Sequence, residues 1–279
     1  MTANEIRELQ QKAVEIRRLT VDEIAHLGVG HVGGSMSVVE ILTLLYYRHL
    51  RVNPAEPRDP KRDKLVMSKG HAGPTLYAIL ADKGFFPKEM LHTLNQGGTN
   101  LPSHCDMNRT PGIDMTTGSL GQGLSAAIGI ALGHRLQQLP GRIFALIGDG
   151  DLNEGQTWEA AMSGAMFGVT NLVAFVDYNK MQIDGPIDSV MKTGQLAQRW
   201  ESFGWHTQQV NGHDFAELDA ALEAALAQSE RPAMIIADTV KGKGLPFAEG
   251  DYKNHNMPIT DEQAAEAYAA LQQEMEALS

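Results

Sequence analysis

Two apolar runs on either side of a helix-forming segment restrict the possible folds of this chain more than any other feature. The runs, Arg142–Ile147 and Leu172–Val176, are short and bounded by turn residues, which is typical of neighbouring buried strands. The segment between them, Glu154–Phe167, is predicted to be the connecting helix. A strand–helix–strand unit of this kind is parallel, so both strands end at the same edge of the sheet.

Polar residues follow both strands at that edge. Asp149 lies in the glycine turn Gly148–Gly150, and Asn179 follows the next strand, one crossover later. Magnesium prefers about six oxygen ligands, usually one or two carboxylates together with the phosphates of its ligand. Asp149, the Asn179 amide oxygen and the Met181 carbonyl therefore predict a site for Mg²⁺, with Ca²⁺ or Mn²⁺ as alternatives. Gly150 allows an anion close to the backbone, and the helix start at Glu154 is expected to present N–H groups to it. A glycine–aspartate turn alone would be ordinary; its spacing from Asn179 indicates the site.

A second glycine pattern, Gly121–Ala126, matches the dinucleotide-binding motif but lacks its context. No clear strand precedes it, and Pro140–Arg142 stand where an acidic ribose ligand is required. We therefore reject a nicotinamide site. The same glycines are expected to direct amides toward a diphosphate at the start of a helix over Leu124–Leu136.

Several stretches of the chain resemble the transketolase family. The glycine turn and the distant Asn179 are similar to the thiamine diphosphate signature, and the other matching stretches follow in family order along nearly the whole chain. These stretches are GHVGGSMSVVE at Gly30–Glu40, MSKGHAGPTLYA at Met67–Ala78, LPSHCD at Leu101–Asp106, TTGSLGQGLSAAIG at Thr116–Gly129, and KGKGLPF from Lys241 with the later His255.

The histidines form a second informative set. Six of the ten fall within predicted elements or ordinary connections and are expected to be structural or solvated. The other four, His31, His71, His104 and His255, lie in loops or at element ends beside glycine or turn residues, where the backbone can direct a side chain into a cleft. Imidazole titrates near neutral pH and both donates and accepts hydrogen bonds, which suits contacts with reacting hydroxyls.

The resemblance implies a role for each candidate residue. Catalytic contacts with the sugar are implied for His31, His104 and His255. Lys241 precedes His255 at a spacing similar to that of the family, although a solvated lysine after a strand is the alternative. Contacts with thiamine diphosphate are implied for His71, Gly118, Ser119, Leu120, Gly150, Asn179, Lys241 and His255, and metal ligation for Asp149, Asn179 and Met181. Departures from the family pattern occur at Asp151, Asn254 and Asn256, so we expect an altered sugar-facing wall.

The overall pattern predicts an α/β fold: one domain over residues 1–279 with a doubly wound, mostly parallel sheet and helices on both faces. Capping-box patterns predict helix starts at Thr2, Ser37 and Thr260. The loop region Asn95–Thr117 is long and is expected to be functional because it contains His104.

Charge and composition exclude several classes of protein. The net charge of −11 argues against general affinity for nucleic acid or anionic membranes. There is no apolar run long enough to span a membrane and no apolar export signal. The single cysteine, Cys105, excludes an internal disulfide framework and is expected to be incidental to catalysis. We expect a cytoplasmic location.

The resemblance covers only the amino-terminal part of a transketolase, and the pyrimidine-binding and carboxyl-terminal domains are not found before Ser279. It therefore implies the amino-terminal subunit of a split transketolase. With a separately encoded partner, in an α2β2 assembly, this subunit would transfer a two-carbon ketol unit between sugars or sugar phosphates. The alternatives are the α subunit of a 2-oxo acid dehydrogenase, a fragment of a deoxyxylulose phosphate synthase, or a non-catalytic cofactor-binding subunit. The sequence leaves open which sugars are the donor and the acceptor, and these include sulfonated and branched sugars.

Overall fold

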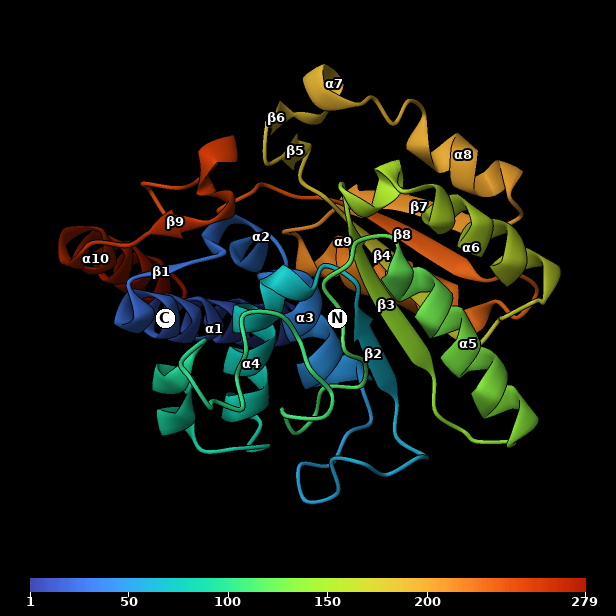
Figure 1. Cartoon of the computed structure of the whole chain (residues 1–279), viewed down its shortest axis with the longest axis horizontal. Coiled ribbons are helices and arrows are strands. Elements are labelled where there is room, and N and C mark those ends of the chain that lie inside the picture. The colour runs from blue at the N-terminus through green and yellow to red at the C-terminus, as the bar shows by residue number, and fades with distance from the viewer.

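The fold is built around one parallel sheet of five strands, in the order β2-β3-β4-β8-β7. A computed structural model describes all residues from 1 to 279 (Figure 1). The predicted doubly wound α/β fold is confirmed, and every pairing in this sheet is parallel. The strands are β2 Lys64–Met67, β3 Ile143–Gly148, β4 Leu172–Tyr178, β7 His206–Asn211 and β8 Ala233–Asp238.

Helices cover both faces of the sheet. Along β3, Phe144 and Leu146 belong to one hydrophobic core, whereas Ile143, Ala145 and Ile147 belong to the other. This alternation explains why the strand is apolar throughout, since both of its faces are buried. The first core is closed by α1 Ala3–Leu27, α2 Val32–Met36, α3 Val39–Leu44, α4 Gly73–Asp82, α9 Phe215–Ala227 and α10 Asp261–Ala277, and the second by α5 Gln122–Leu136, α6 Gly155–Met166 and α8 Leu196–Ser202.

Short elements lie outside these layers. The hairpin of β5 and β6 leads into α7, and these elements stand above the carboxyl ends of the strands in Figure 1. A separate two-stranded sheet pairs β1 with β9 in antiparallel register. The bounds are β1 Val29–Gly30, β5 Met181–Gln182, β6 Gly185–Pro186, α7 Ile187–Val190 and β9 Met257–Pro258. Short helices of other types lie at Leu45–His49 (η1), Gly70–Ala72 (η2), Lys88–Thr93 (η3), Asp151–Asn153 (η4) and Tyr252–His255 (η5).

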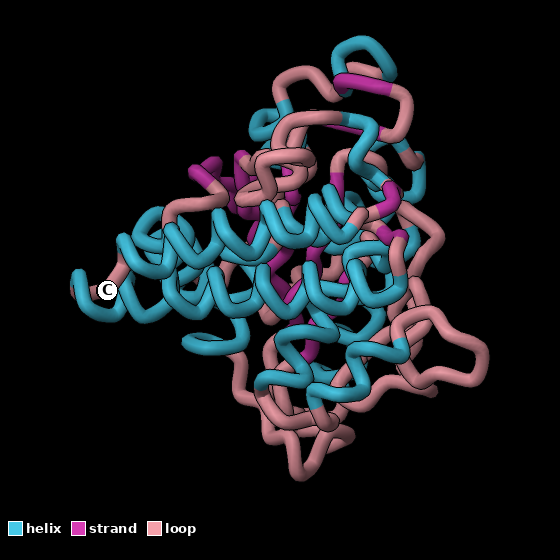
Figure 2. The backbone as a smooth tube through the Cα atoms, turned by 90° about the vertical axis from the view of Figure 1, so that its left-hand side faces the viewer, coloured by secondary structure: helices cyan, strands magenta, loops and turns pink.

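Two of the three predicted capping boxes are present, at the starts of α1 and α10. Thr2 and Thr260 each accept the backbone N–H three residues later and receive the reciprocal side-chain contact. The two helices pack against each other, and Gln11 Nε2 donates to the Leu278 carbonyl at 3.0 Å. Figure 2 looks onto this side of the molecule, where long helices lie side by side.

The third predicted capping box, at Ser37 and Glu40, is wrong. No single helix runs from Ser37 to Leu50; α2, α3 and η1 follow one another, and Val38 is the residue before α3. The Ser37 hydroxyl donates to a carboxylate on β4, and Glu40 accepts from Arg17 Nη2 at 2.5 Å. Contacts with distant segments therefore replaced the local pattern, because both side chains are buried.

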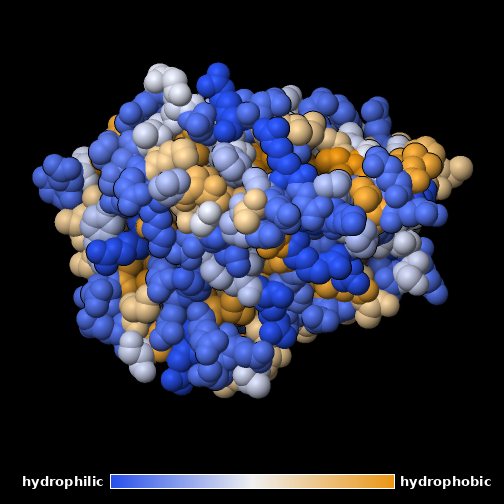
Figure 3. Space-filling view, turned by 90° about the horizontal axis from the view of Figure 1, so that it is seen from below, coloured by the Kyte–Doolittle hydropathy of each residue, from blue (hydrophilic) through white to orange (hydrophobic).

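One face of the molecular surface shows the distribution of polar and apolar residues. Seen from below, it is largely hydrophilic, with small scattered apolar areas (Figure 3). None of the helices combines the length and the apolar character required to cross a membrane.

Candidate active site

A cavity of about 400 Å³ opens at the carboxyl edge of the sheet, beyond β3 and β4. This is the position where open α/β sheets bind ligands. Every candidate site residue from the sequence lines it except Ser119, which is exposed at the turn into α5. The predicted residues in the lining are His31, His71, His104, Gly118, Leu120, Asp149, Gly150, Asn179, Met181, Lys241 and His255.

The Asp149 carboxylate occupies one side of the cavity. Its Oδ2 accepts the backbone N–H of Lys180 at 2.7 Å, whereas its Oδ1 is buried and has no hydrogen-bond partner. Burial, followed by the negative charge of Asp177, raises the pKa of Asp149 to about 8. A divalent cation at Oδ1 would remove this unfavourable arrangement, since oxygen donors are what Mg²⁺ prefers. The Asn179 amide oxygen, which accepts from Met181 N at 3.1 Å, lines the same cavity.

Lys241 supplies a positive group to the cavity. It follows β8 in the chain, and its Nζ is buried without a hydrogen-bond partner. Burial, together with the neighbouring Lys69 ammonium, lowers the pKa of Lys241 to about 8. A phosphate group at this ammonium would provide the missing partner.

The four loop histidines converge on the cavity from four separate segments. His31 precedes α2, His71 lies in η2, His104 in the irregular loop after η3, and His255 ends η5. The ring centroid of His31 lies 5.4 Å from those of His71 and His255 and 5.3 Å from that of His104. His71 and His255 are separated by 4.9 Å.

Burial keeps these imidazoles neutral. It lowers the pKa of His31 to about 4, with a further contribution from His104, and that of His255 to about 3, with a further contribution from Lys241. Burial also lowers the pKa of His71 well below its usual range, and it lowers the pKa of His104. A neutral imidazole both donates and accepts, so the cluster can hold hydroxyl groups in fixed orientations at neutral pH.

A buried ion pair at the cavity was not predicted from the sequence. Asp177 is completely buried and forms an ion pair with Lys69, which itself lines the cavity. The period of two along β4 places Asp177 on the same side as Asn179, and this signal could have identified it. Lys69 lies within the segment Met67–Ala78 that the sequence analysis singled out, but nothing in its local sequence indicates a buried pair.

The backbone N–H groups that we expected to face a bound anion, at the starts of two helices, are not found there. The helix α6 begins at Gly155, after the η4 turn, and its first residues do not line the cavity. The Gly121 N–H, at the start of α5, donates to Asp151 Oδ1 at 2.7 Å. Asp151 also accepts from Gly148 N at 2.8 Å and from the Ser68 hydroxyl at 2.5 Å, so this side chain joins three segments internally.

Of the three residues expected to alter the sugar-facing wall, Asp151 lines the cavity. For Asn254 and Asn256 the expectation is wrong, because neither lines it. Asn254 is buried and donates from Nδ2 to the Ala248 carbonyl at 2.5 Å, whereas Asn256 is exposed. Asn254 instead lies behind Gly33, where a β-carbon would overlap its Oδ1.

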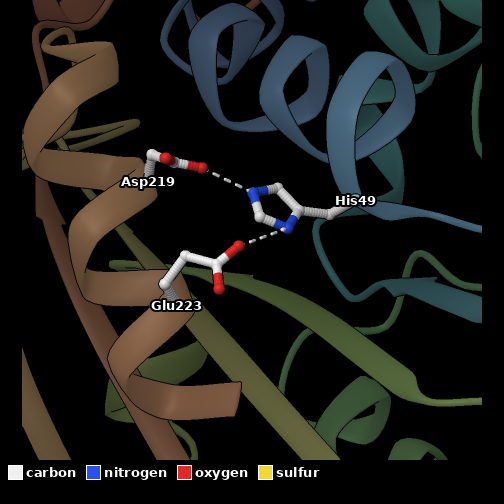
Figure 4. A group of neighbouring side chains, drawn as sticks. All are labelled: His49, Asp219 and Glu223. Carbon is white, nitrogen blue, oxygen red and sulfur yellow. Dashed lines mark hydrogen bonds and ion pairs between the residues drawn. The ribbon is translucent and has the colours of Figure 1, made fainter. Parts of the chain in front are cut away.

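A cluster of His49, Asp219 and Glu223 lies on η1 and α9, outside the cavity (Figure 4). His49 Nε2 is 2.7 Å from Asp219, whereas its Nδ1 is 3.7 Å from Glu223. Asp219 is also held by Arg48 Nε at 2.8 Å. Because Asp219 is already contacted by both His49 and Arg48, we describe the cluster as a polar network that joins η1 to α9.

Comparison with known families matches residues 9–277 to the family described as "Transketolase, thiamine diphosphate binding domain". The chain is 52% identical over 267 residues to "6-deoxy-6-sulfo-D-fructose transketolase subunit SqwG" of Clostridium sp. (strain MSTE9), covering 96% of this chain and 97% of the relative. It is 35% identical over 274 residues to an apulose-4-phosphate transketolase subunit of Phocaeicola vulgatus, covering 98% of this chain and 97% of the relative.

Solved structures give the same relationship. The crystal structure of transketolase from Campylobacter jejuni superposes with a TM-score of 0.90 at 31% identity, covering 100% of this chain and 46% of that one. The chain therefore spans less than half of that transketolase, but nearly all of each relative named as a subunit.

Proposed function

The chain belongs to the transketolase family, and from this premise we propose that it is the thiamine diphosphate- and magnesium-binding subunit of a two-subunit transketolase. One observation carries the proposal. The cavity contains a buried carboxylate oxygen, Asp149 Oδ1, and a buried ammonium, Lys241 Nζ, and neither has a partner. A cation bound to a diphosphate would satisfy both groups at once.

The residues of the cavity divide into two groups in this proposal. Asp149, Asn179 and the Met181 carbonyl would hold the metal ion, with Lys241 and His71 on the diphosphate. Gly118, Leu120 and Gly150 form a wall that can approach the cofactor closely. At Gly150 a β-carbon would lie 2.8 Å from Leu120 Cδ1, so a larger residue would disturb this wall. Ser119 is exposed outside the cavity and is not part of this wall.

The histidines supply orientation and proton transfer. Thiamine diphosphate provides a carbon nucleophile for breaking and forming the carbon–carbon bond when it is bound. His31, His104 and His255 surround the same space as neutral rings and can bind the hydroxyl and carbonyl oxygens of a ketose. The Ser103 hydroxyl lies 2.9 Å from His104 Nδ1, which orients that ring.

A second subunit is expected to close the cavity. Two relatives that are matched over 97% of their own length are both named as subunits. Ile183, between β5 and β6, lines the cavity and is 63% exposed, and Met191, directly after α7, is 57% exposed. Apolar side chains beside an open site are typical of an interface. We propose that the separately encoded partner covers them, in an α2β2 assembly in the cytoplasm.

The proposed donor is a ketose with an anionic terminal group. The relative with 52% identity is named for 6-deoxy-6-sulfo-D-fructose, and those at 35% and 37% for apulose 4-phosphate. The higher identity favours the sulfonated sugar as donor, with an aldose phosphate as acceptor. The 2-oxo acid dehydrogenase alternative is not favoured, because the family and the relatives are transketolases.

The test is reconstitution. The full chain would be mixed with the separately encoded partner subunit and assayed with thiamine diphosphate and Mg²⁺. Donors would be 6-deoxy-6-sulfofructose, fructose 6-phosphate, apulose 4-phosphate and pyruvate. We expect ketol transfer only from the mixture, fastest with the sulfonated ketose. Full activity of the chain alone, or turnover of pyruvate only, would contradict the proposal.

A further inference from the structure

Asp177 forms a polar centre directly behind the candidate metal site. It is completely buried, and its carboxylate is surrounded by donors from four segments of the chain. Oδ2 accepts from the Ser37 hydroxyl at 2.7 Å, from the Asn179 amide at 3.0 Å, and from the Lys69 ammonium. Oδ1 accepts from the Thr239 hydroxyl. No atom of this carboxylate is left over for the cavity, so its function must be exerted through its neighbours.

The contact with Asn179 determines which way that amide faces. Asp177 and Asn179 are two positions apart at the end of β4, so their side chains lie on the same side. A carboxylate only accepts hydrogen bonds, whereas an amide has one accepting oxygen and one donating nitrogen. Because Nδ2 is directed at Asp177, Oδ1 is directed away from it, toward Met181 N at 3.1 Å. Only this orientation presents an oxygen that can bind a metal ion.

Lys69 makes the buried carboxylate possible. The side chains of Lys69 and Asp177 are 2% and 0% exposed, so neither charge is solvated. Removing one partner of such a pair leaves an uncompensated buried charge, which is strongly destabilising. Gly34 allows this packing, since a β-carbon there would lie 3.4 Å from Lys69 Nζ and 3.0 Å from His71 Nε2.

We propose that Asp177, paired with Lys69, is a positioning residue that fixes the amide orientation of Asn179 and so presents its oxygen to the divalent cation. The proposal rests on the metal site of the proposed function. Partners that orient metal ligands in this way typically change metal affinity by about 10- to 100-fold when they are mutated. The structure thus assigns an effect on cation affinity to a residue that has no access to the cavity and acts through Asn179.

The test measures binding of Mn²⁺ by electron paramagnetic resonance, with thiamine diphosphate, in the full chain assembled with its partner. In Asp177→Asn the new amide can accept or donate, so the Met181 N–H is the one contact left that holds Asn179 in its orientation. We expect the Mn²⁺ dissociation constant to rise by about 10- to 100-fold.

The matched control is Asp114→Asn. Asp114 is also a buried acid, paired with Arg62 at 2.7 Å, but it contacts the start of β2 at the other edge of the sheet. This control should leave Mn²⁺ affinity within about threefold of wild type, because the two sites are independent.

A double variant, Lys69→Met with Asp177→Asn, protects the test against misfolding because it removes both buried charges together. We expect its free energy of unfolding to return toward wild type while Mn²⁺ binding stays weak. Wild-type Mn²⁺ affinity in folded Asp177→Asn, or in the double variant, would overturn the positioning role of Asp177 and leave the metal site itself standing. A wild-type assembly that binds no Mn²⁺ would instead overturn the metal site and, with it, the proposed function.

Discussion

The Asp149 carboxylate and the Lys180 backbone N–H are joined by a hydrogen bond of 2.7 Å, which connects the turn after β3 with the segment after β4. This contact brings the two halves of the predicted metal site together at the edge of the sheet. It uses one carboxylate oxygen and leaves the other buried without a partner. Without its ligand, the chain therefore carries the free-energy penalty of a buried carboxylate oxygen that has no partner.

We expect Asp149→Asn to stabilise the chain in the absence of metal. Burial and the neighbouring Asp177 disfavour the charge of Asp149, and the amide removes this charge while its oxygen still accepts from Lys180. A gain of about 1 kcal/mol in the free energy of unfolding is of the size found for relief of strained functional sites. Urea denaturation with and without Mg²⁺ and thiamine diphosphate measures it. Wild type should be stabilised by the ligands, whereas the variant should not; a variant that is less stable without ligand would contradict the explanation.

Gly33→Ala is expected to destabilise the chain and weaken cofactor binding. A β-carbon there would overlap Asn254 Oδ1 and lie 2.9 Å from Lys241 Cγ, so the buried lysine would have to move. Overpacking of this kind costs about 1–3 kcal/mol. The matched control is Gly129→Ala in α5, where no atom lies within 4 Å of the added carbon. The control should gain about 0.5–1 kcal/mol, since alanine favours a helix interior. Equal effects of the two substitutions in urea denaturation would refute the steric argument.

The histidine cluster makes the stability of the chain depend on pH. In the unfolded chain histidine has a pKa of about 6.5. In the fold, burial lowers the pKa of His31 to about 4 and that of His255 to about 3. Between those values the unfolded state binds more protons, so stability should fall as pH decreases from about 6.5 toward about 4. His255→Asn should reduce the difference between urea midpoints at pH 7 and pH 5. An unchanged difference would show that His255 does not contribute to it.

In the reconstituted enzyme, His104→Ala is expected to reduce kcat/KM by about 100-fold, the usual contribution of one positioned acid or base. The matched control is His92→Ala, since His92 stacks on His26 and lies 2.7 Å from Asp22, outside the cavity. That variant should retain activity. Steady-state assays with the preferred ketose measure both. A loss of activity at His92 equal to that at His104 would indicate a general effect on folding.

Local sequence patterns correctly predicted two of the three helix starts that were based on capping boxes. The capping boxes at Thr2 and Thr260 are confirmed, because their side chains are exposed and have only the nearby backbone to bind. The similar pattern at Ser37 and Glu40 fails, since Ser37 binds Asp177 and Glu40 binds Arg17. The difference is burial: a buried polar side chain takes whichever partner the packing provides.

The order of residues along the chain sufficed for the parallel sheet, the crossover between β3 and β4, and the residues that meet at the end of those strands. Apolar periodicity and turn residues act over short distances, and strand direction then places polar groups at a common edge. Packing alone determined that Asp151 binds the amides expected for a ligand, that Asn254 leaves the cavity wall, and that Lys69 and Asp177 form a buried pair behind Asn179. Such contacts join segments far apart in the sequence, and they depend on which buried polar groups come within hydrogen-bonding distance once the two cores have closed.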